Sequence, residues 1–161
     1  MQITVREALP DDARTIAGFN SDMAMETEGK TLDPDLIGPG VAALLEDASR
    51  GRYWVAVDDN RVIGQLMVTY EWSDWRNGNI WWIQSVYVHP DWRRHGVFRA
   101  LYQHVESLAS ATPGVIGLRL YVETGNTRAQ QTYEALGMVK PNYLVMEAML
   151  SNSNADTNGE T

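Results

Sequence analysis

The sequence predicts an α/β protein with a mixed central sheet and helices on its faces. Runs with the two-residue periodicity of strands alternate along the chain with segments of helical periodicity. Two turn signals, at residues 58–61 and 75–79, each separate two strand-like runs and predict hairpins. A strand-like run ending at Val88 leads through a basic loop into an amphipathic helix, which predicts a strand-to-helix unit.

The first third of the chain predicts one strand and two helices. We expect a strand at residues 3–5 and then a helix that begins at Asp11 or Asp12. Residues 20–40 are expected to be irregular because they are polar and contain helix-breaking residues. These are Gly29, Pro34, Gly38 and Pro39. A short second helix is expected near residues 41–49, where apolar residues recur at helical spacing.

The remaining two thirds predict five further strands and two helices. The strands are expected at residues 53–57, 62–70, 80–88, 115–122 and 143–149. The first helix follows the basic loop and carries an apolar stripe of Phe98, Leu101, Tyr102, Val105, Leu108 and Ala109. The second helix is expected at residues 127–136, with Gly137 ending it.

Length and composition favour one globular domain over residues 1–150, followed by a disordered polar tail at residues 151–161. Cysteine is absent, and no apolar run approaches the ~20 residues of a membrane span, so we expect a cytoplasmic protein without membrane contact. A net charge of −8 argues against a nucleic-acid partner. It is compatible with a cationic substrate.

The loop before the long helix has the features of an anion site. Arg93, Arg94, His95 and Gly96 stand directly before the helix. The first amides of a helix lack intrahelical partners and, with the helix dipole, favour a negatively charged ligand. Arginine adds forked donors that suit phosphate oxygens. The alternative is a solvated helix start that happens to be basic.

Two motifs in order along the chain resemble the GNAT acetyltransferase superfamily, over about residues 3–149. The family's acyl-coenzyme A motif, Gln/Arg-x-x-Gly-x-Gly/Ala, is matched by Arg93 and Gly96, with Phe98 as a departure at the last position. The family's Asn-x-x-Ala-x-x-x-Tyr-x-x-x-Gly-Phe segment is similar to the chain from Asn126 to Met138, with Tyr133 at the tyrosine position.

The resemblance implies a GNAT fold: a mostly antiparallel sheet of six to seven strands with splayed central strands. It also implies transfer of an acetyl group from acetyl-coenzyme A to a primary amine of a small molecule, peptide or protein, without a metal. The residues it assigns to the coenzyme are Ser85, Val86, Tyr87, Val88, Arg93, Arg94, His95, Gly96, Val97, Phe98, Asn126 and Tyr133. The strand before the loop typically carries a bulge, with an unpaired amide expected near Val86 to hold the developing oxyanion.

Phe98 need not obstruct phosphate binding, since it belongs to the apolar stripe and we expect its ring to face the core. A phosphate cradle uses backbone amides, which a core-facing side chain leaves free. For the strand residues Val86 and Val88, plain core packing is an alternative compatible with a role at the coenzyme.

By resemblance, Tyr133 is the proton donor to the departing thiolate, with packing of its helix as the alternative. Asn126 is either a ligand of the pantetheine arm or a turn residue. Some members carry a glutamate base where this chain has Gln84, and an amide cannot accept a proton. Glu26 and Glu28 are therefore candidate bases, and Glu71 and Glu123 are the other candidates. The residues expected around the acceptor are Glu26, Glu28, Glu71, Trp72 and Gln84. For each carboxylate, a solvated surface position is the alternative.

A Trp-rich hairpin allows three interpretations. Trp72, Trp75, Trp81 and Trp82, mixed with acidic residues, could form a cation-attracting pocket, a homodimer surface or ordinary core packing. His89, His95 and His104 lack metal-ligand spacing, so no metal site is expected. A second function class stays open, namely a catalytically silent acyl-coenzyme A sensor or partner module. Gln84 keeps that alternative open, whereas Tyr133 favours the enzyme.

Overall fold

The computed structural model describes residues 1–150, so the tail predicted at residues 151–161 lies outside the described part. The chain divides into two compact units, Met1–Leu120 and Tyr121–Thr161. The single domain expected over residues 1–150 stays a prediction. Within the described residues, none of the helices combines the length and the apolar character needed to span a membrane.

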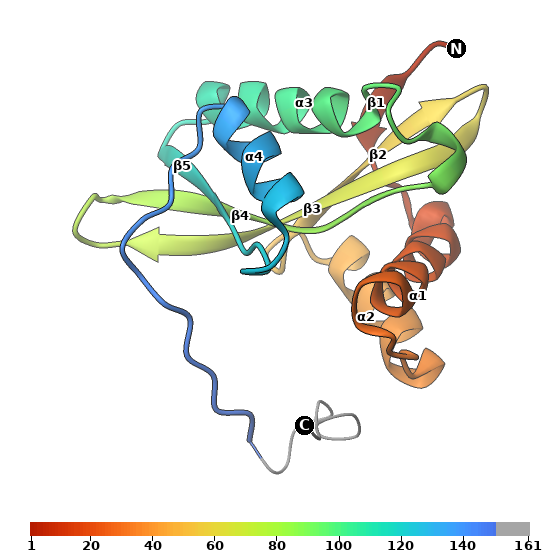
Figure 1. Cartoon of the computed structure of the whole chain (residues 1–161), viewed down its shortest axis with the longest axis horizontal. Coiled ribbons are helices and arrows are strands. Elements are labelled where there is room, and N and C mark those ends of the chain that lie inside the picture. Colours follow the sequence, from red (N-terminus) through yellow and green to blue (C-terminus); the bar gives the residue numbers. More distant parts are fainter. Residues whose placement is uncertain (151–161) are drawn as a thin grey trace. The chain divides into compact units, whose positions relative to one another are not determined.

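The first unit is built on a five-stranded sheet whose spatial order follows the sequence (Figure 1). Its strands are β1 (Thr4–Glu7), β2 (Arg52–Asp58), β3 (Arg61–Ser73), β4 (Gly78–Val88) and β5 (Val115–Leu120). All neighbours are antiparallel except β4 and β5, which are parallel. Both predicted hairpins are confirmed. At the first, Asp59 and Asn60 adopt positive φ angles of 44° and 66°, as a tight two-residue turn requires.

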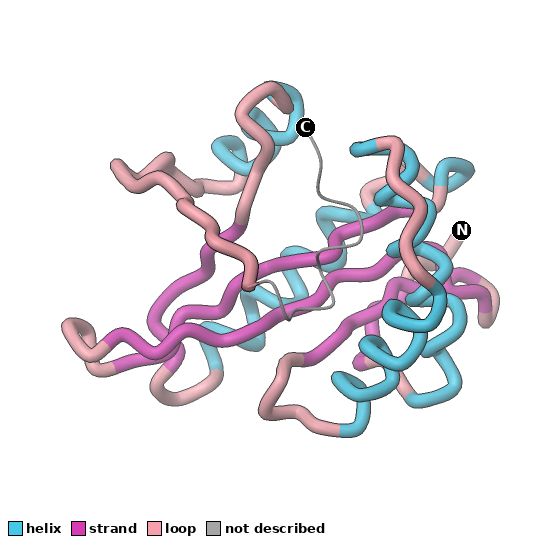
Figure 2. Tube along the Cα trace, turned by 90° about the horizontal axis from the view of Figure 1, so that it is seen from below, coloured by secondary structure: helices cyan, strands magenta, loops and turns pink. Residues whose placement is uncertain are grey.

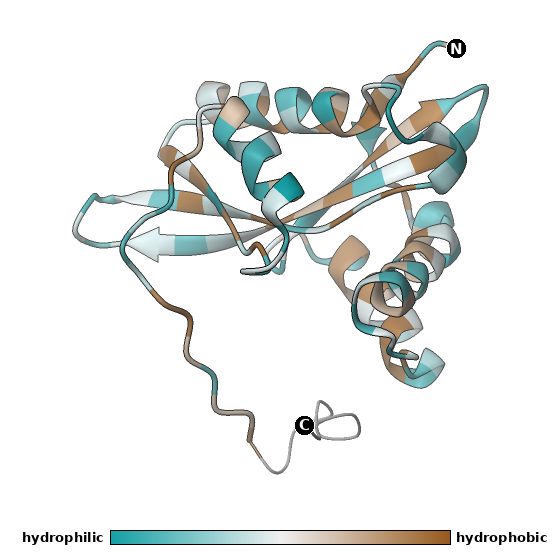
Figure 3. Cartoon of the chain, viewed as in Figure 1, coloured by the Kyte–Doolittle hydropathy of each residue, from teal (hydrophilic) through white to brown (hydrophobic). Residues whose placement is uncertain are grey.

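Helices cover both faces of this sheet. Helices α1 (Ala13–Glu28) and α2 (Pro34–Glu46) lie on one face, and α3 (Val97–Ala111) lies on the other. Seen from below in Figure 2, α1 and α2 stand in front of the sheet and α3 behind it. Figure 3 shows the hydrophobic residues concentrated on the strands and on α2. A core of Ile16, Val41, Tyr53 and Val55 joins α1 and α2 to β2.

The expected count of six to seven strands is wrong for the described residues, which contain five. The strand predicted at residues 143–149 is not formed, and this segment has no regular secondary structure. Alternating apolar residues suit a strand only where a neighbour completes the hydrogen-bonded ladder. Among the described residues, this segment pairs with none of the five strands.

The prediction that residues 20–40 are irregular is also wrong, because α1 continues to Glu28 and α2 begins at Pro34. Gly29, with φ of 62°, ends α1, and Asp33 caps α2 by accepting a hydrogen bond from the Asp35 amide at 2.9 Å. Pro39 lies inside α2. The helix persists because Val41 and its apolar neighbours pack against the core, which outweighs low helix propensity.

The parallel pair β4–β5 separates halfway along β4. Ladder partners run from Asn79 to Ile83 on β4, and β5 ends at Leu120, the partner of Ile83. Among the described strands, the second half of β4, from Gln84 to Val88, is therefore paired only with β3. The splay of central strands that the family resemblance implies stays a prediction.

Candidate functional site

The basic loop forms an open cradle at the N-terminus of α3. The short 3-10 helix η2 (Pro90–Trp92) follows β4, and Gly96, with φ of 79°, immediately precedes α3. The first intrahelical hydrogen bond runs from the Ala100 amide to the Gly96 carbonyl at 3.0 Å, so the earlier amides have no acceptor within the helix. A Cβ atom built on Gly96 meets no other atom within 4 Å. The space beside the Gly96 Cα, at the entrance to the helix, is therefore open.

The residue that anchors α3 in the core is Val97 rather than Phe98. Val97 is 2% exposed and lies directly over Gly64 of β3, where a Cβ on the glycine would stand 2.9 Å from Val97 Cγ1. The Phe98 ring is half-buried, with its centroid 6.0 Å from that of Tyr102. The expectation that Phe98 faces the core is therefore met only in part. Phe98, the residue that departs from the motif, therefore lies on a helix that is held in the core by its neighbour Val97.

Arg93 is held by three partners around the cradle. Its Nε donates to the Val88 carbonyl at 2.9 Å and its Nη2 donates to Glu26 Oε2 at 2.7 Å. Its guanidinium carbon also lies 5.3 Å from the centroid of the Tyr87 ring. Arg94 and His95 are exposed. Arg93 thus differs from Arg94 and His95, because its guanidinium already binds the Glu26 carboxylate.

Glu26 joins the end of α1 to this loop and to β4. Its Oε1 accepts a hydrogen bond from the Tyr87 hydroxyl at 2.9 Å, in addition to the bond from Arg93. Desolvation alone would raise the pKa of Glu26, but the hydrogen bonds from Arg93 and Tyr87 outweigh it and leave that pKa below its usual value. Desolvation, with the bond to Glu26, raises the pKa of Tyr87 to about 12. A lowered pKa makes Glu26 a weaker base than an unpaired glutamate.

Strand β4 carries the bulge that the family resemblance implies. Gln65 pairs with Tyr87 and Met67 pairs with Gln84, so β4 has one more residue than β3 between these pairs. Ser85, inside the bulge, has φ of 50°, a left-handed conformation that side chains disfavour. The predicted coenzyme residues Ser85 and Val86 therefore stand outside the regular ladder.

A buried polar side chain that sequence reasoning missed contacts this bulge. Gln65 is 0% exposed, and its Nε2 donates to the Ser85 carbonyl at 3.1 Å and to Asn20 Oδ1 at 3.0 Å. Asn20 in turn donates from Nδ2 to the Tyr53 hydroxyl at 3.0 Å. The available signal was a glutamine in the middle of an otherwise apolar strand run, where burial without a polar partner is unfavourable.

The predicted acceptor residues do not gather at one place. Gln84 Nε2 donates to Thr69 Oγ1 across the β3–β4 pair at 2.6 Å. Glu71 forms an ion pair with Arg119 of β5, and Glu28 lies 3.6 Å from Lys30. Trp72 is exposed, and as the strand neighbour of Glu71 it points to the opposite face of the sheet.

The tryptophans of the hairpin are also dispersed. Trp81 is buried and stacks on Trp54, with centroids 6.1 Å apart, which matches ordinary core packing. Trp75 is 90% exposed near the hairpin tip. A shared pocket of these rings is therefore not present, while Trp72 and Trp75 remain available at the surface.

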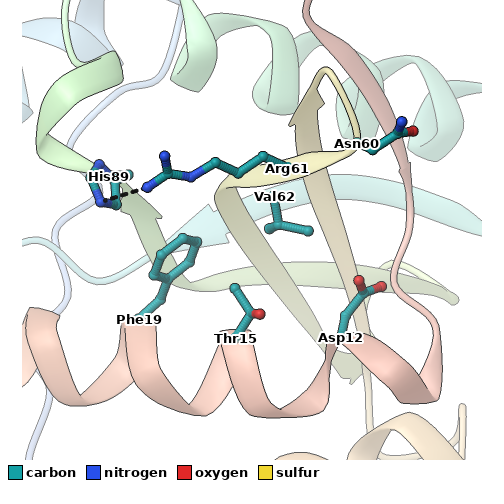
Figure 4. A pocket seen from close by; sticks show the side chains of 7 residues that line it. All are labelled: Asp12, Thr15, Phe19, Asn60, Arg61, Val62 and His89. Carbon is teal, nitrogen blue, oxygen red and sulfur yellow. Dashed lines mark hydrogen bonds between the residues drawn. The ribbon is translucent and has the colours of Figure 1, made fainter.

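A cavity of about 390 Å³ lies beside α1 at the end of the β2–β3 hairpin (Figure 4). Its lining residues are Asp12, Thr15, Phe19, Asn60, Arg61, Val62 and His89. Arg61 lies within 3.5 Å of His89 Nε2, and its guanidinium also covers the Trp92 ring at 4.4 Å. None of the site residues predicted from the sequence lines this cavity.

The second unit holds the remaining predicted site residues, on and before helix α4 (Thr127–Ala135). Asn126 caps α4, since its Oδ1 accepts a hydrogen bond from the Ala129 amide at 3.1 Å. Gly137, with φ of 93°, follows the helix as predicted. Burial raises the pKa of Tyr133 above its usual value of 10.

Comparison with known proteins identifies the fold and the family. The family model for the Acetyltransferase (GNAT) family matches residues 21–138, most of the chain. The chain belongs to the GNAT acetyltransferase family. No curated protein sequence matches it.

Solved structures agree with this assignment. The GNAT chain is similar to a possible acetyltransferase from Clostridium difficile 630, with 47% identity, a TM-score of 0.87, and coverage of 93% of this chain and 99% of the other. A ribosomal-protein-alanine N-acetyltransferase from Brucella melitensis biovar Abortus 2308 shares the fold, at 15% identity and a TM-score of 0.74, over 92% and 99% of the two chains.

The residues at the α3 N-terminus fit the acyl-coenzyme A that GNAT enzymes typically use. Open amides, a glycine with free space before it and the exposed Arg94 and His95 suit a pyrophosphate. The described residues contain no cluster of three or more His, Asp or Glu side chains able to hold a metal ion. Membership of the family implies an acyltransferase.

Proposed function

We propose that this protein is an N-acetyltransferase that moves the acetyl group of acetyl-coenzyme A to a primary amine in a ternary complex. The observation that carries the proposal is the continuity of bulge and cradle. Residues 85–96 form one stretch of chain that begins with the β4 bulge at Ser85 and ends at Gly96 before α3. One stretch thus offers backbone groups to a thioester arm and amides to a pyrophosphate.

The cradle would bind the coenzyme through its phosphates. The pyrophosphate is expected at the amides that open α3, with Arg94 and His95 as exposed side-chain donors. The pantetheine arm is expected along Ser85, Val86, Tyr87 and Val88, at the part of β4 that β5 leaves unpaired. An amide near Val86 would then polarise the thioester carbonyl and stabilise the oxyanion.

In the reaction, the nitrogen of the neutral amine attacks the thioester carbonyl carbon. The new C–N bond forms and the C–S bond breaks. The departing thiolate takes a proton from Tyr133, and the amine nitrogen loses one to a base. Holding both substrates in one site supplies much of the acceleration by proximity. Tyr133 carries its proton at neutral pH, as a phenol ordinarily does.

Glu26 and Glu28 are the proposed bases, and both lie in the last turn of α1. Glu28 is exposed and pairs loosely with Lys30, whereas Glu26 is occupied by Arg93 and Tyr87. The acceptor is proposed to be an amine, and a cationic acceptor would be compatible with the net charge of −8. Glu71, Trp72 and Gln84 are proposed as further contacts of the acceptor. A homodimer and a cytoplasmic location stay predictions.

Release of coenzyme A tests this function directly. The purified chain would be mixed with acetyl-coenzyme A and a panel of primary amines, and free thiol would be followed with a chromogenic disulfide. Because the chain has no cysteine, every thiol detected comes from the coenzyme. Amine-dependent release supports the proposal. Tight binding of acetyl-coenzyme A without release on any amine would overturn it in favour of the silent sensor.

A further inference from the structure

Gln65 of β3 lies fully buried beneath the β4 bulge. We propose that Gln65 is a positioning residue for acyl transfer, which aims the Val86 amide by holding the Ser85 carbonyl. This inference rests on the proposed function. Its geometric part, the anchoring of the bulge, can be measured without turnover.

The link between Gln65 and Val86 follows from the planarity of the peptide group. The Ser85 carbonyl and the Val86 N–H belong to one peptide unit, and in a trans peptide they point in opposite directions. The described residues contain no cis peptide. The hydrogen bond from Gln65 Nε2 draws the Ser85 carbonyl toward β3, at 3.1 Å. The Val86 N–H is thereby turned away from Gln65.

The bulge needs such an anchor because its backbone conformation is disfavoured. Ser85 has φ of 50°, which a non-glycine residue holds only when its surroundings determine it. Ser85 and Val86 have no register partners in β3, so they lie outside the regular pairing of the two strands. The Gln65 side chain supplies a hydrogen bond to the Ser85 carbonyl at this irregular position.

Gln65 is itself fixed by a chain of buried hydrogen bonds. Its Nε2 also donates to Asn20 of α1, and Asn20 donates to the Tyr53 hydroxyl of β2. Asn20 and Tyr53 are at most 5% exposed. Three separate elements therefore orient the amide that meets the bulge.

The Gln65 side chain uses its donor group but not its acceptor group. Gln65 Oε1 is buried and has no hydrogen-bond partner among the described residues. A buried unpaired polar atom is unfavourable, and a methionine of similar length would fill the same space without one. Methionine would, however, leave the Ser85 carbonyl and Asn20 Oδ1 without this donor, so the glutamine is explained by its hold on the bulge.

The experiment compares Gln65→Met with a control of the same strand. Ile63→Val removes one methylene from a fully buried neighbour and leaves the Gln65 hydrogen bonds in place. For Gln65→Met we expect kcat to fall roughly 10- to 100-fold, because an oxyanion donor that is misaligned loses much of its effect. The KM for acetyl-coenzyme A should change by less than about threefold, which is the size of effect expected when only a weak binding contact is lost. Ile63→Val should retain kcat.

A second readout follows the bulge itself. Amide hydrogen exchange at Tyr87, whose ladder pair with Gln65 closes the bulge, should be at least several-fold faster in Gln65→Met than in Ile63→Val when the two are compared at equal unfolding free energy. If Gln65→Met does not fold, Asn20→Ala serves instead. It removes the hydrogen bond between Gln65 and Asn20, leaves the Gln65 side chain less firmly held, and should lower kcat to a smaller degree. Equal kcat and equal exchange in the variant and the control would overturn the proposal.

The outcomes separate this inference from the proposed function. If the wild-type chain releases no coenzyme A with any amine, the proposed function fails. The exchange comparison then still decides whether Gln65 anchors the bulge. If the wild type turns over and only kcat of the Gln65 variant falls, with exchange faster at Tyr87, both proposals stand.

Discussion

The Glu26 carboxylate accepts a hydrogen bond from the Arg93 guanidinium at 2.7 Å, across 67 positions of sequence. This pair connects the last turn of α1 to the loop that opens the coenzyme cradle. Arg93 is thus shared between a carboxylate of the protein and the anion expected at the cradle. The pair predicts competition between Glu26 and the coenzyme phosphates for one guanidinium.

Replacing Glu26 should therefore tighten coenzyme binding. In Glu26→Gln the carboxylate no longer competes for Arg93, and exposed ion pairs of this kind contribute about 0.2–1 kcal/mol, so we expect the Kd for coenzyme A to fall by up to about fivefold. Isothermal titration calorimetry at low salt would measure it. Glu46→Gln, at an exposed acid of α2, serves as the charge-matched control.

The same variant distinguishes two roles for Glu26. If Glu26 is the catalytic base, kcat falls in Glu26→Gln and the pH–rate profile loses its acidic limb. If Glu26 only restrains Arg93, kcat is retained while binding tightens. Weaker coenzyme binding in Glu26→Gln would contradict the competition.

Removing the hydroxyl of Tyr133 should affect turnover more than binding. A phenol carries its proton at neutral pH, and Tyr133 is the group proposed to give that proton to the departing thiolate. Loss of a general acid typically lowers the rate by about 10²- to 10⁴-fold. We expect Tyr133→Phe to lower kcat within this range and to leave the Kd for acetyl-coenzyme A nearly unchanged. Wild-type kcat in Tyr133→Phe would exclude the assigned role.

A methyl group at Gly96 should weaken coenzyme binding. Gly96 has φ of 79°, and a Cβ there would project into the open space of the cradle. Backbone strain in Gly96→Ala is expected to lower the free energy of unfolding by about 1–2 kcal/mol. In addition, the affinity for the coenzyme should fall by about tenfold because the methyl group obstructs the phosphates. A loss of this size is expected when one charge-assisted hydrogen bond is lost.

The matched control for Gly96 is Gly114→Ala. Gly114 has φ of 81° and equally open space, but it lies at the far end of α3. The two variants should lose similar stability in urea unfolding. Only Gly96→Ala should lose coenzyme affinity, and equal affinities in the two variants would place the phosphates elsewhere.

Asp12 should make the fold sensitive to acid. Its carboxylate accepts two hydrogen bonds from the Arg6 guanidinium, at 2.7 and 3.0 Å, and one from the Leu9 amide at 2.7 Å. The Arg6 hydrogen bonds hold the pKa of Asp12 below its usual 3.8, despite partial desolvation. A lowered pKa means that the unfolded chain binds the proton more readily, so stability rises with pH.

The contribution of Asp12 is therefore complete above about pH 5 and is lost as the pH falls through 3.8 toward the lower folded value. Urea unfolding of Asp12→Asn from pH 7 to pH 3 should start at lower stability and vary less with pH than the wild type. Asp11→Asn, at the exposed neighbour, should follow the wild-type profile. A wild-type slope in Asp12→Asn would contradict this account.

Features encoded by neighbouring residues were predictable from the sequence. The turn at residues 58–61, the glycine before α3 and the strand-to-helix unit around Arg93 all depend on local conformational preferences. Predictions failed where packing overrode those preferences. Helix α2 contains Pro39 because its apolar face is buried, and residues 143–149 form no strand because a strand needs a hydrogen-bonded neighbour.

The sequence by itself determined the family, through an anion loop and a tyrosine-bearing segment in the right order. Only the tertiary structure decided that Val97 rather than Phe98 anchors α3, that Glu26 binds Arg93, and that Gln65 holds the bulge at Ser85. Local motifs consist of residues that are adjacent in the sequence. The contacts of Glu26 and Gln65 join residues from different elements, and the role of Val97 depends on which face of its helix is buried. Their distances exist only after the sheet and its helices have packed.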